Sequence, residues 1–293
     1  MFDTLEACAA AWEQAGNHGD IQTRIARNAR WIPYYAFLAD GREEADAAID
    51  PHAAAVADGL VSRGYLGAGS TVLDIGSGTG AFAHAFASRG ARVTALEMDA
   101  SSLAVCRAQA QQLGLNGMQF VQQMWETFAP NERYDFVFSS MCPAICNYAE
   151  LQRMESLSKY ACGIIAVTRG SYDLHRKRLM TLLDVHPVGG MTTEALWYYE
   201  TLYLAGKQPE VTSFSRKFAY ALPLEETIAR NERYGPLPSL AFICLTPDRH
   251  KVGDDSEKRV DAIPRETPAH RAPLDESDLS GVGSDAVVVC LAF

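Results

Sequence analysis

Three glycines within five residues mark the part of the chain best suited to hold a ligand. Residues 72–80 read Val-Leu-Asp-Ile-Gly-Ser-Gly-Thr-Gly, an apolar strand that runs into a glycine-rich turn before a helical pattern. Glycine adopts backbone angles that other residues avoid and lets a ligand approach the main chain closely. Because Gly76, Gly78 and Ala81 also satisfy the dinucleotide fingerprint, the glycines predict a nucleoside ligand without identifying it.

Asp74 distinguishes between the possible ligands by charge. It lies two positions before Gly76, at the end of a strand that faces the glycine turn. Its carboxylate would repel a pyrophosphate, whereas it would attract a ligand that carries an ammonium and a sulfonium. An NAD-dependent oxidoreductase is therefore disfavoured.

At these residues the sequence resembles the class I S-adenosylmethionine-dependent methyltransferases, whose first motif reads like residues 72–80. The resemblance continues at residues 93–99, 120–126 and 134–140. It implies a Rossmann-like α/β fold and an enzyme that uses S-adenosyl-L-methionine as methyl donor, with S-adenosyl-L-homocysteine as the product.

The resemblance also implies which residues bind the cofactor. Glu97, which ends the second strand, is expected to accept both ribose hydroxyls, and Met98 is expected to lie against adenine. Many members have an Asp at the place of Met124, so Trp125 is expected to supply packing or backbone contacts instead. The complete expected set is Asp74, Gly76, Ser77, Gly78, Gly80, Glu97, Met98, Met124, Trp125 and Ser140.

The acceptor is expected after the fourth strand, because ligands of open α/β sheets lie beyond the carboxyl ends of the strands. Residues 140–146 read Ser-Met-Cys-Pro-Ala-Ile-Cys and lack the acidic or amide residue and the aromatic that enzymes methylating adenine N6 or glutamine amides often have there. Cys142 and Tyr34 are candidates for a catalytic role, although a free cysteine is more often a small buried apolar residue. The histidines that are candidate bases by type alone are His52, His84, His175 and His186.

The charge of the chain bears on its partners. Its 293 residues carry 26 Lys and Arg against 36 Asp and Glu, a formal net charge of -10. Proteins that bind nucleic acids need dense basic surfaces, so a small-molecule substrate is expected and no nucleic acid. An RNA or protein methyltransferase and a non-catalytic binder of S-adenosylmethionine or S-adenosylhomocysteine remain the alternatives.

The location is predicted from what the sequence lacks. No apolar run reaches the roughly 18 residues of a membrane span, and the N-terminus lacks the order of a signal peptide. Seven cysteines without a secretory signal indicate reduced thiols in the cytoplasm. No second close pair joins Cys142 and Cys146, so no metal site is expected.

The elements that would position these residues alternate along the chain. Short strands are expected at residues 71–75, 92–96, 118–122, 134–139 and 162–168, with helices between them. This order predicts a parallel sheet with helices on both faces. Two further strands, 211–220 and an antiparallel last strand at 286–293, would make the sheet seven-stranded; residues 239–245 compete for the last place.

Two segments outside this alternation complete the predicted organisation. Residues 1–65 form a helical cap, in which Pro33 breaks or kinks a helix at 21–38 and Trp31, Tyr34 and Tyr35 form a substrate lid. The alternative is that these aromatic side chains pack on the core. Residues 66–293 form the methyltransferase domain, in which 247–285 are a mobile insertion without aromatic residues.

Overall fold

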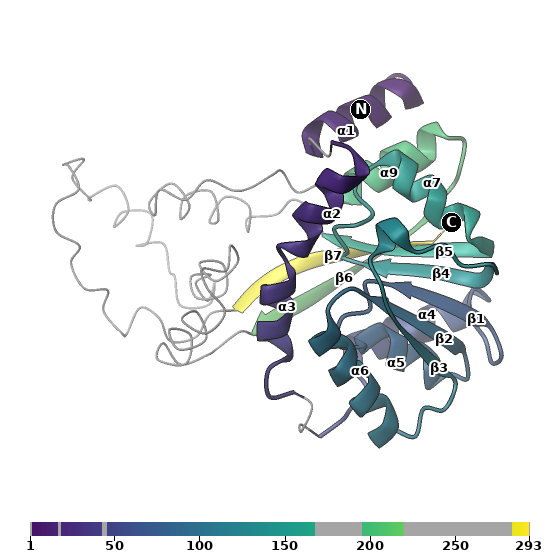
Figure 1. Cartoon of the computed structure of the whole chain (residues 1–293). Coiled ribbons are helices and arrows are strands. Elements are labelled where there is room, and N and C mark those ends of the chain that lie inside the picture. Colours follow the sequence, from purple (N-terminus) through teal and green to yellow (C-terminus); the bar gives the residue numbers. More distant parts are fainter. Residues whose placement is uncertain (1, 17–18, 43–45, 168–194, 220–282, 293) are drawn as a thin grey trace, which may run out of the picture. The chain divides into compact units, whose positions relative to one another are not determined.

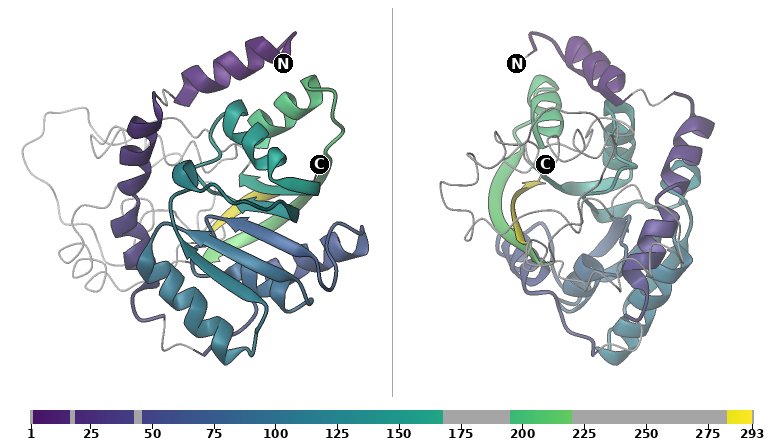
Figure 2. Two further views of the ribbon diagram at one scale, coloured as in Figure 1. Left: turned by 45° about the vertical axis from the view of Figure 1, so that its right-hand side comes forward. Right: turned by 90° about the vertical axis from the view of Figure 1, so that its left-hand side faces the viewer.

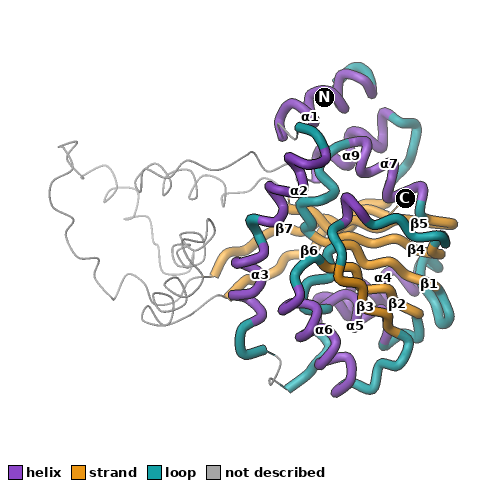
Figure 3. The backbone as a smooth tube through the Cα atoms, viewed as in Figure 1, coloured by secondary structure: helices purple, strands orange, loops and turns teal. Residues whose placement is uncertain are grey.

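The computed structural model describes residues 2–16, 19–42, 46–167, 195–219 and 283–292 (Figure 3). The chain divides into two compact units, of which the first is Met1–Thr168, Val188–Phe214 and Val287–Phe293. The second is Arg169–Pro187 and Ser215–Ala286. The described part of the second unit is limited to the adjoining ends of two strands, so the fold below is that of the first unit.

Four helices precede the sheet: α1 (Leu5–Gly16), α2 (Ile21–Ala29), α3 (Ile32–Ala39) and α4 (Pro51–Ser62). The side chain of Asp20 accepts a hydrogen bond from the Thr23 backbone N at 2.8 Å and so caps α2. The helix expected at 21–38 is broken, as predicted, but the break lies between Ala29 and Ile32, and Pro33 lies in the first turn of α3, where proline is tolerated. Asp50 caps α4, with Pro51 in its first turn.

Five parallel strands form the centre of the sheet: β1 (Thr71–Ile75), β2 (Arg92–Glu97), β3 (Met118–Gln122), β4 (Tyr134–Ser140) and β5 (Ser158–Val167). β1 pairs with β2 and with β4, β2 pairs with β3, and β4 pairs with β5. The predicted α/β class with a parallel sheet is confirmed. β5 begins four residues before the predicted start because Ser158 pairs with Tyr134 of β4.

Two more strands follow β5, so that the strand order is β3-β2-β1-β4-β5-β7-β6. β6 spans Glu210–Ala219 and β7 spans Gly283–Ala292. β7 runs antiparallel to β5, with residues 288–292 opposite Gly163–Val167. The competing strand at 239–245 and most of the expected insertion at 247–285 lie outside the described residues.

Helices cover both faces of the sheet (Figure 1). Alternate residues of a strand point to opposite faces, and Val72 of β1 therefore belongs to one core cluster while Leu73 belongs to the other. The first cluster includes side chains of α4, α5 (Ala81–Ala87) and α6 (Ala100–Gln112). The second includes side chains of α1, α7 (Tyr148–Ser156) and α9 (Ala195–Leu204). Among the described residues no helix is both long and apolar enough to cross a membrane.

The N-terminal helices α2 and α3 run beside the sheet in the views of Figures 1 and 2. α2 contacts the short 3-10 helix η1 (Trp125–Thr127), which follows β3, and α3 contacts α6. Because η1 lies past the end of β3, α2 is placed at the edge where the parallel strands end. The glycine turn after β1 lies at the same edge.

Candidate functional site

The glycine turn follows the carboxyl end of β1 and is hydrogen-bonded to the carboxyl end of β2. The backbone N–H groups of Gly76 and Ser77 donate to the carbonyl oxygen of Leu96 at 2.9 and 3.0 Å. Gly76 and Gly80 have φ angles of 70° and 94°, in the left-handed region that favours glycine. A Cβ atom on Gly78 would meet nothing within 4 Å. The turn thus has a main chain that borders open space, as the approach of a ligand requires.

Two polar atoms at this turn are buried and have no hydrogen-bond partner: Oδ2 of Asp74 and Oγ of Ser77. Asp74 is only 2% exposed and accepts a hydrogen bond from the Ala83 backbone N–H. Burial, and next the nearby Glu97 carboxylate, raise the pKa of Asp74 to about 7. Buried polar groups in native structures are normally paired, so these atoms fit a ligand that brings donors and positive charge.

Glu97 at the end of β2 is held rigidly. Its Oε2 accepts from the Gly78 backbone N at 2.8 Å, and its Oε1 accepts from the Asp99 backbone N at 2.9 Å. Burial raises the pKa of Glu97, while the backbone hydrogen bonds from Asp99 and Gly78 lower it in part. Each carboxylate oxygen has a second lone pair, so this side chain retains the capacity to accept two hydroxyl donors.

Comparison with known families agrees with this geometry. Residues 72–159 match the family model described as a methyltransferase domain, and they contain β1 to β4, the glycine turn and Glu97. Residues 72–159 therefore form an S-adenosylmethionine-dependent methyltransferase domain. The predicted family, enzyme class and methyl donor, S-adenosylmethionine, are thereby confirmed.

A search of solved structures finds proteins that are similar to this chain. A putative methyltransferase from Bacillus halodurans has a TM-score of 0.50 at 14% identity, over 81% of this chain and 97% of that one. The YcgJ protein from Bacillus subtilis has a TM-score of 0.49 at 14% identity, over 83% and 97%. Magnesium protoporphyrin IX methyltransferase from Synechocystis, with bound S-adenosylhomocysteine, has a TM-score of 0.49 at 16% identity, over 67% and 92%. A comparison with curated proteins finds no match.

The remaining expected cofactor residues lie at the same edge of the methyltransferase domain. Met98 directly follows β2, Met124 precedes η1, and Ser140 ends β4. Of the two contacts expected of Trp125, ring packing is disfavoured, because the ring is engaged by α7. Its Nε1 donates to Oε2 of Glu150 at 2.7 Å, and the Arg153 guanidinium lies 4.0 Å from the ring centroid. Its backbone, rather than its ring, therefore remains the part that could face adenine.

The loop after β4 has a strained start. Met141 has a φ of 49° and is the only described residue other than glycine with a positive φ. It is followed by Cys142, whose Sγ would lie 2.6 Å from a Cβ atom on Gly76. The thiol of Cys142 is therefore packed against the glycine turn. Burial raises its pKa to about 12, which keeps it protonated near neutral pH and argues against a nucleophilic role.

The other catalytic candidates are placed as follows. Nε2 of His84 lies 2.8 Å from the carbonyl oxygen of Cys106, and burial lowers the pKa of this imidazole, so it is neutral and structural. His52 lies against Phe82, with ring centroids 6.1 Å apart. His175 and His186, and the side chain of Tyr34, lie outside the described residues.

The expected lid residues Trp31 and Tyr35 are half-buried. Their ring centroids lie 6.3 Å apart at the junction of α2 and α3. The lid itself stays a prediction. Two further residues near the site, Asn28 and Glu126, were not predicted from the sequence; both are buried where α2 meets η1. These two residues are 98 positions apart in the sequence, so no local sequence pattern predicts their contact.

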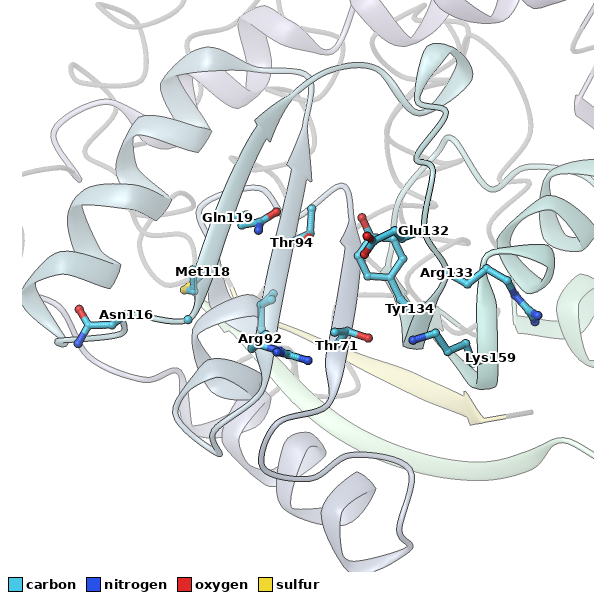
Figure 4. Close-up of a pocket in the computed structure, with 12 residues that line it drawn as sticks. Thr71, Arg92, Thr94, Asn116, Met118, Gln119, Glu132, Arg133, Tyr134 and Lys159 are labelled. Atoms are coloured by element: carbon cyan, nitrogen blue, oxygen red, sulfur yellow. The ribbon is translucent and has the colours of Figure 1, made fainter.

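A hollow of about 550 Å³ lies at the opposite edge of the sheet (Figure 4). Its lining includes Thr71, Arg92, Met118 and Tyr134, which are the first residues of β1 to β4. None of the expected cofactor residues lines it. Because ligands of such sheets lie at the carboxyl ends of the strands, this hollow is separate from the methyl-transfer site.

The stability of the ligand-free methyltransferase should fall as the pH rises from about 4 to about 8, in part through Asp74. The pKa of this carboxyl in the folded protein, about 7, is above its ordinary value of 3.8, so the folded state holds the proton more tightly than the unfolded state. The resulting stability is complete below the unfolded pKa and is lost as the pH rises through 7. A shift of about three pKa units corresponds to a decrease on the order of 4 kcal/mol in the free energy of unfolding.

Urea unfolding of the unaltered protein and of the Asp74→Asn variant at several pH values measures this contribution. The variant keeps the size of the side chain and removes its charge, so its free energy of unfolding should depend less on pH in this window. Equal pH slopes in the two proteins would show that Asp74 does not titrate there.

Proposed function

We propose that the chain transfers the methyl group of S-adenosylmethionine to a small-molecule acceptor, which binds beyond the carboxyl ends of β1 and β4. The observation that carries the proposal is the pair of buried, unpartnered atoms at the glycine turn, Oδ2 of Asp74 and Oγ of Ser77. A cofactor with an ammonium group would supply the donors and the positive charge that this place lacks. When bound, the cofactor supplies an activated methyl group on its sulfonium.

The residues of the chain would then act by binding and orientation. Asp74 and the turn from Gly76 to Gly80 would hold the amino-acid end of the cofactor. Glu97 would accept the ribose hydroxyls, with adenine between Met98 and the backbone of Met124 and Trp125. Ser140 would border the methyl group. Methyl transfer is an in-line displacement, so the acceptor must be aligned and water excluded.

The proposal extends to the organisation of the chain. We propose that residues 1–65 are a helical cap, in which Trp31, Tyr34 and Tyr35 form a lid, and that residues 66–293 are the methyltransferase domain. We also propose that residues 286–293 are a required antiparallel strand of a seven-stranded sheet; the pairing of β5 with β7 supports this. No base is assigned, because the thiol of Cys142 stays protonated and His84 is structural.

A small acceptor is favoured over RNA by the net charge of -10, because phosphate binding requires dense basic residues. Incubation of the purified protein with methyl-labelled S-adenosylmethionine and a cell extract tests this. The extract is separated into a low-molecular-weight fraction, total RNA and protein. Label should enter the low-molecular-weight fraction, and heat-inactivated protein is the control. Label that enters only RNA or only protein would contradict the proposal.

A further inference from the structure

One face of α2 contacts three segments that follow the carboxyl ends of β3 and β4. Asn28 is 2% exposed, and its Nδ2 donates to Oε1 of Glu126 in η1 at 2.5 Å. Arg24, four residues earlier, donates through Nη2 to Oε1 of Glu150 in α7 at 2.8 Å. Residues four apart lie on the same side of a helix, so both contacts fasten the same face of α2.

A third contact comes from the same face. Nη2 of Arg27 lies 3.6 Å from Sγ of Cys146, which belongs to the loop after β4. Glu150 also accepts from Nε1 of Trp125 at 2.7 Å, so one buried carboxylate joins α2 to η1 and α7. Removal of one partner of such a buried charge is costly, and the position of α2 is therefore tied to the position of η1.

The partner of Asn28 belongs to the surroundings of the methyl-transfer site. Besides burial, the nearby carboxylates of Glu97, Glu126 and Asp74 raise the pKa of the Cys142 thiol, and this thiol packs against Gly76. Glu126 is thus part of the same acidic environment as the two residues expected to bind the cofactor. It is 8% exposed and directly follows Trp125, whose backbone is expected to face adenine.

The orientation of the Asn28 amide follows from its partner. A carboxylate only accepts hydrogen bonds, so the amide nitrogen faces Glu126 and the amide oxygen faces away. That oxygen, Oδ1, is buried and has no protein partner. An aspartate at this position would have two acceptor oxygens and no donor. The neutral amide is therefore the feature that lets α2 lie against an acidic segment.

We propose that Asn28 and Glu126 are positioning residues that hold α2 against η1 and thereby support cofactor binding. This inference rests on the proposed cofactor site. With the pair intact, η1 keeps the adenine-facing backbone in place and α2 shields that edge from water. When the pair is broken, α2 and η1 separate more readily. Part of the binding free energy of the cofactor is then used to restore their contact, so the measured affinity is lower.

The Asn28→Asp variant tests the pair through the affinity for S-adenosylhomocysteine, measured by calorimetry between pH 5 and pH 8. Two ionised carboxylates in this contact repel each other, so the variant should bind about 10-fold more weakly than the unaltered protein at pH 8, within the usual range of coupling between sites. At pH 5 the two carboxyls can share a proton, and the ratio of the two affinities should approach one. The ratio of the two affinities is compared because Asp74 titrates in both proteins, so that its effect on binding cancels in the ratio.

Two further variants separate positioning from a general effect of charge. Asn28→Asp combined with Glu126→Gln exchanges the carboxylate and the amide, and it should restore the affinity and remove the pH dependence of the ratio. Gln22→Glu adds the same charge at an exposed position of α2 and should leave the affinity unchanged. A ratio of one at every pH, or a loss that the exchange does not reverse, would overturn the proposal.

Hydrogen exchange of the unaltered protein provides a second readout if Asn28→Asp impairs folding. S-adenosylhomocysteine should slow the exchange of residues 21–29, and unchanged exchange in this helix with the ligand bound would overturn the inference. Different results would contradict the proposed cofactor site and the proposed role of the pair of Asn28 and Glu126. An unaltered protein that does not bind S-adenosylhomocysteine would refute the proposed cofactor site itself.

Discussion

Replacement of Gly80 by Ala should destabilise the protein by about 2–5 kcal/mol. Its φ of 94° is unfavourable for any residue with a Cβ atom, at a cost of about 1–2 kcal/mol. The new Cβ atom would also lie 2.5 Å from Sγ of Cys106 and 2.6 Å from Cε1 of His84. Both side chains are buried, and His84 is held by its contact with the Cys106 carbonyl oxygen. Overpacking of this kind costs about 1–3 kcal/mol.

The Gly78→Ala variant is the matched control for this prediction. Gly78 also has a positive φ, of 54°, but a Cβ atom there would meet nothing within 4 Å. It should therefore show the cost of the backbone angle without the clash. Urea unfolding of both variants measures the difference, and equal stabilities would mean that His84 and Cys106 move aside without cost.

Deletion of residues 286–293 should make the protein insoluble or markedly less stable. Residues 288–292 lie opposite Gly163–Val167 of β5, whose Ile164, Ile165 and Ala166 are almost completely buried. Without β7, the backbone N–H and C=O groups on that side of β5 lose their partners, and an unpaired apolar edge promotes aggregation. The loss would be a large part of the about 5–15 kcal/mol that stabilises a typical domain.

A deletion of similar size earlier in the chain is the control. Residues 247–285 contain no aromatic residue, and shortening a connection changes the entropy of loop closure only slightly. Removal of residues 255–262 should therefore be tolerated. Solubility, circular dichroism and thermal unfolding distinguish the two deletions. A soluble, cooperatively folding protein that lacks residues 286–293 would show that the terminal strand is dispensable.

The part of the site that could be predicted lies where local sequence dictates local structure. The positive φ angles of Gly76, Gly78 and Gly80 require glycine, so their spacing after an apolar strand was enough to predict the turn. The start of α4 is likewise local, because Asp50 caps the helix within one turn and Pro51 follows it. Pro33 indicated a break in the predicted helix at 21–38, but the break occurs before it, between Ala29 and Ile32.

Contacts between distant parts of the chain could not be predicted in this way. The early start of β5 follows from its pairing with β4, which carries no signal in the polar residues at 158–160. The left-handed backbone of Met141 likewise has no cause in its own side chain, and its N–H donates to the carbonyl oxygen of Ile165 in the neighbouring strand at 2.8 Å. These features depend on which strands lie side by side.

The sequence by itself determined the glycine turn, the acidic residues Asp74 and Glu97 and the alternation of strands and helices, because each depends on backbone preferences and periodicity over a few residues. Only the tertiary structure decided that the ring of Trp125 turns toward α7 and that Asn28 meets Glu126. The direction of a buried side chain depends on the residues that pack against it. Those residues come from distant positions in the sequence, so the residues next to it in the chain do not predict them.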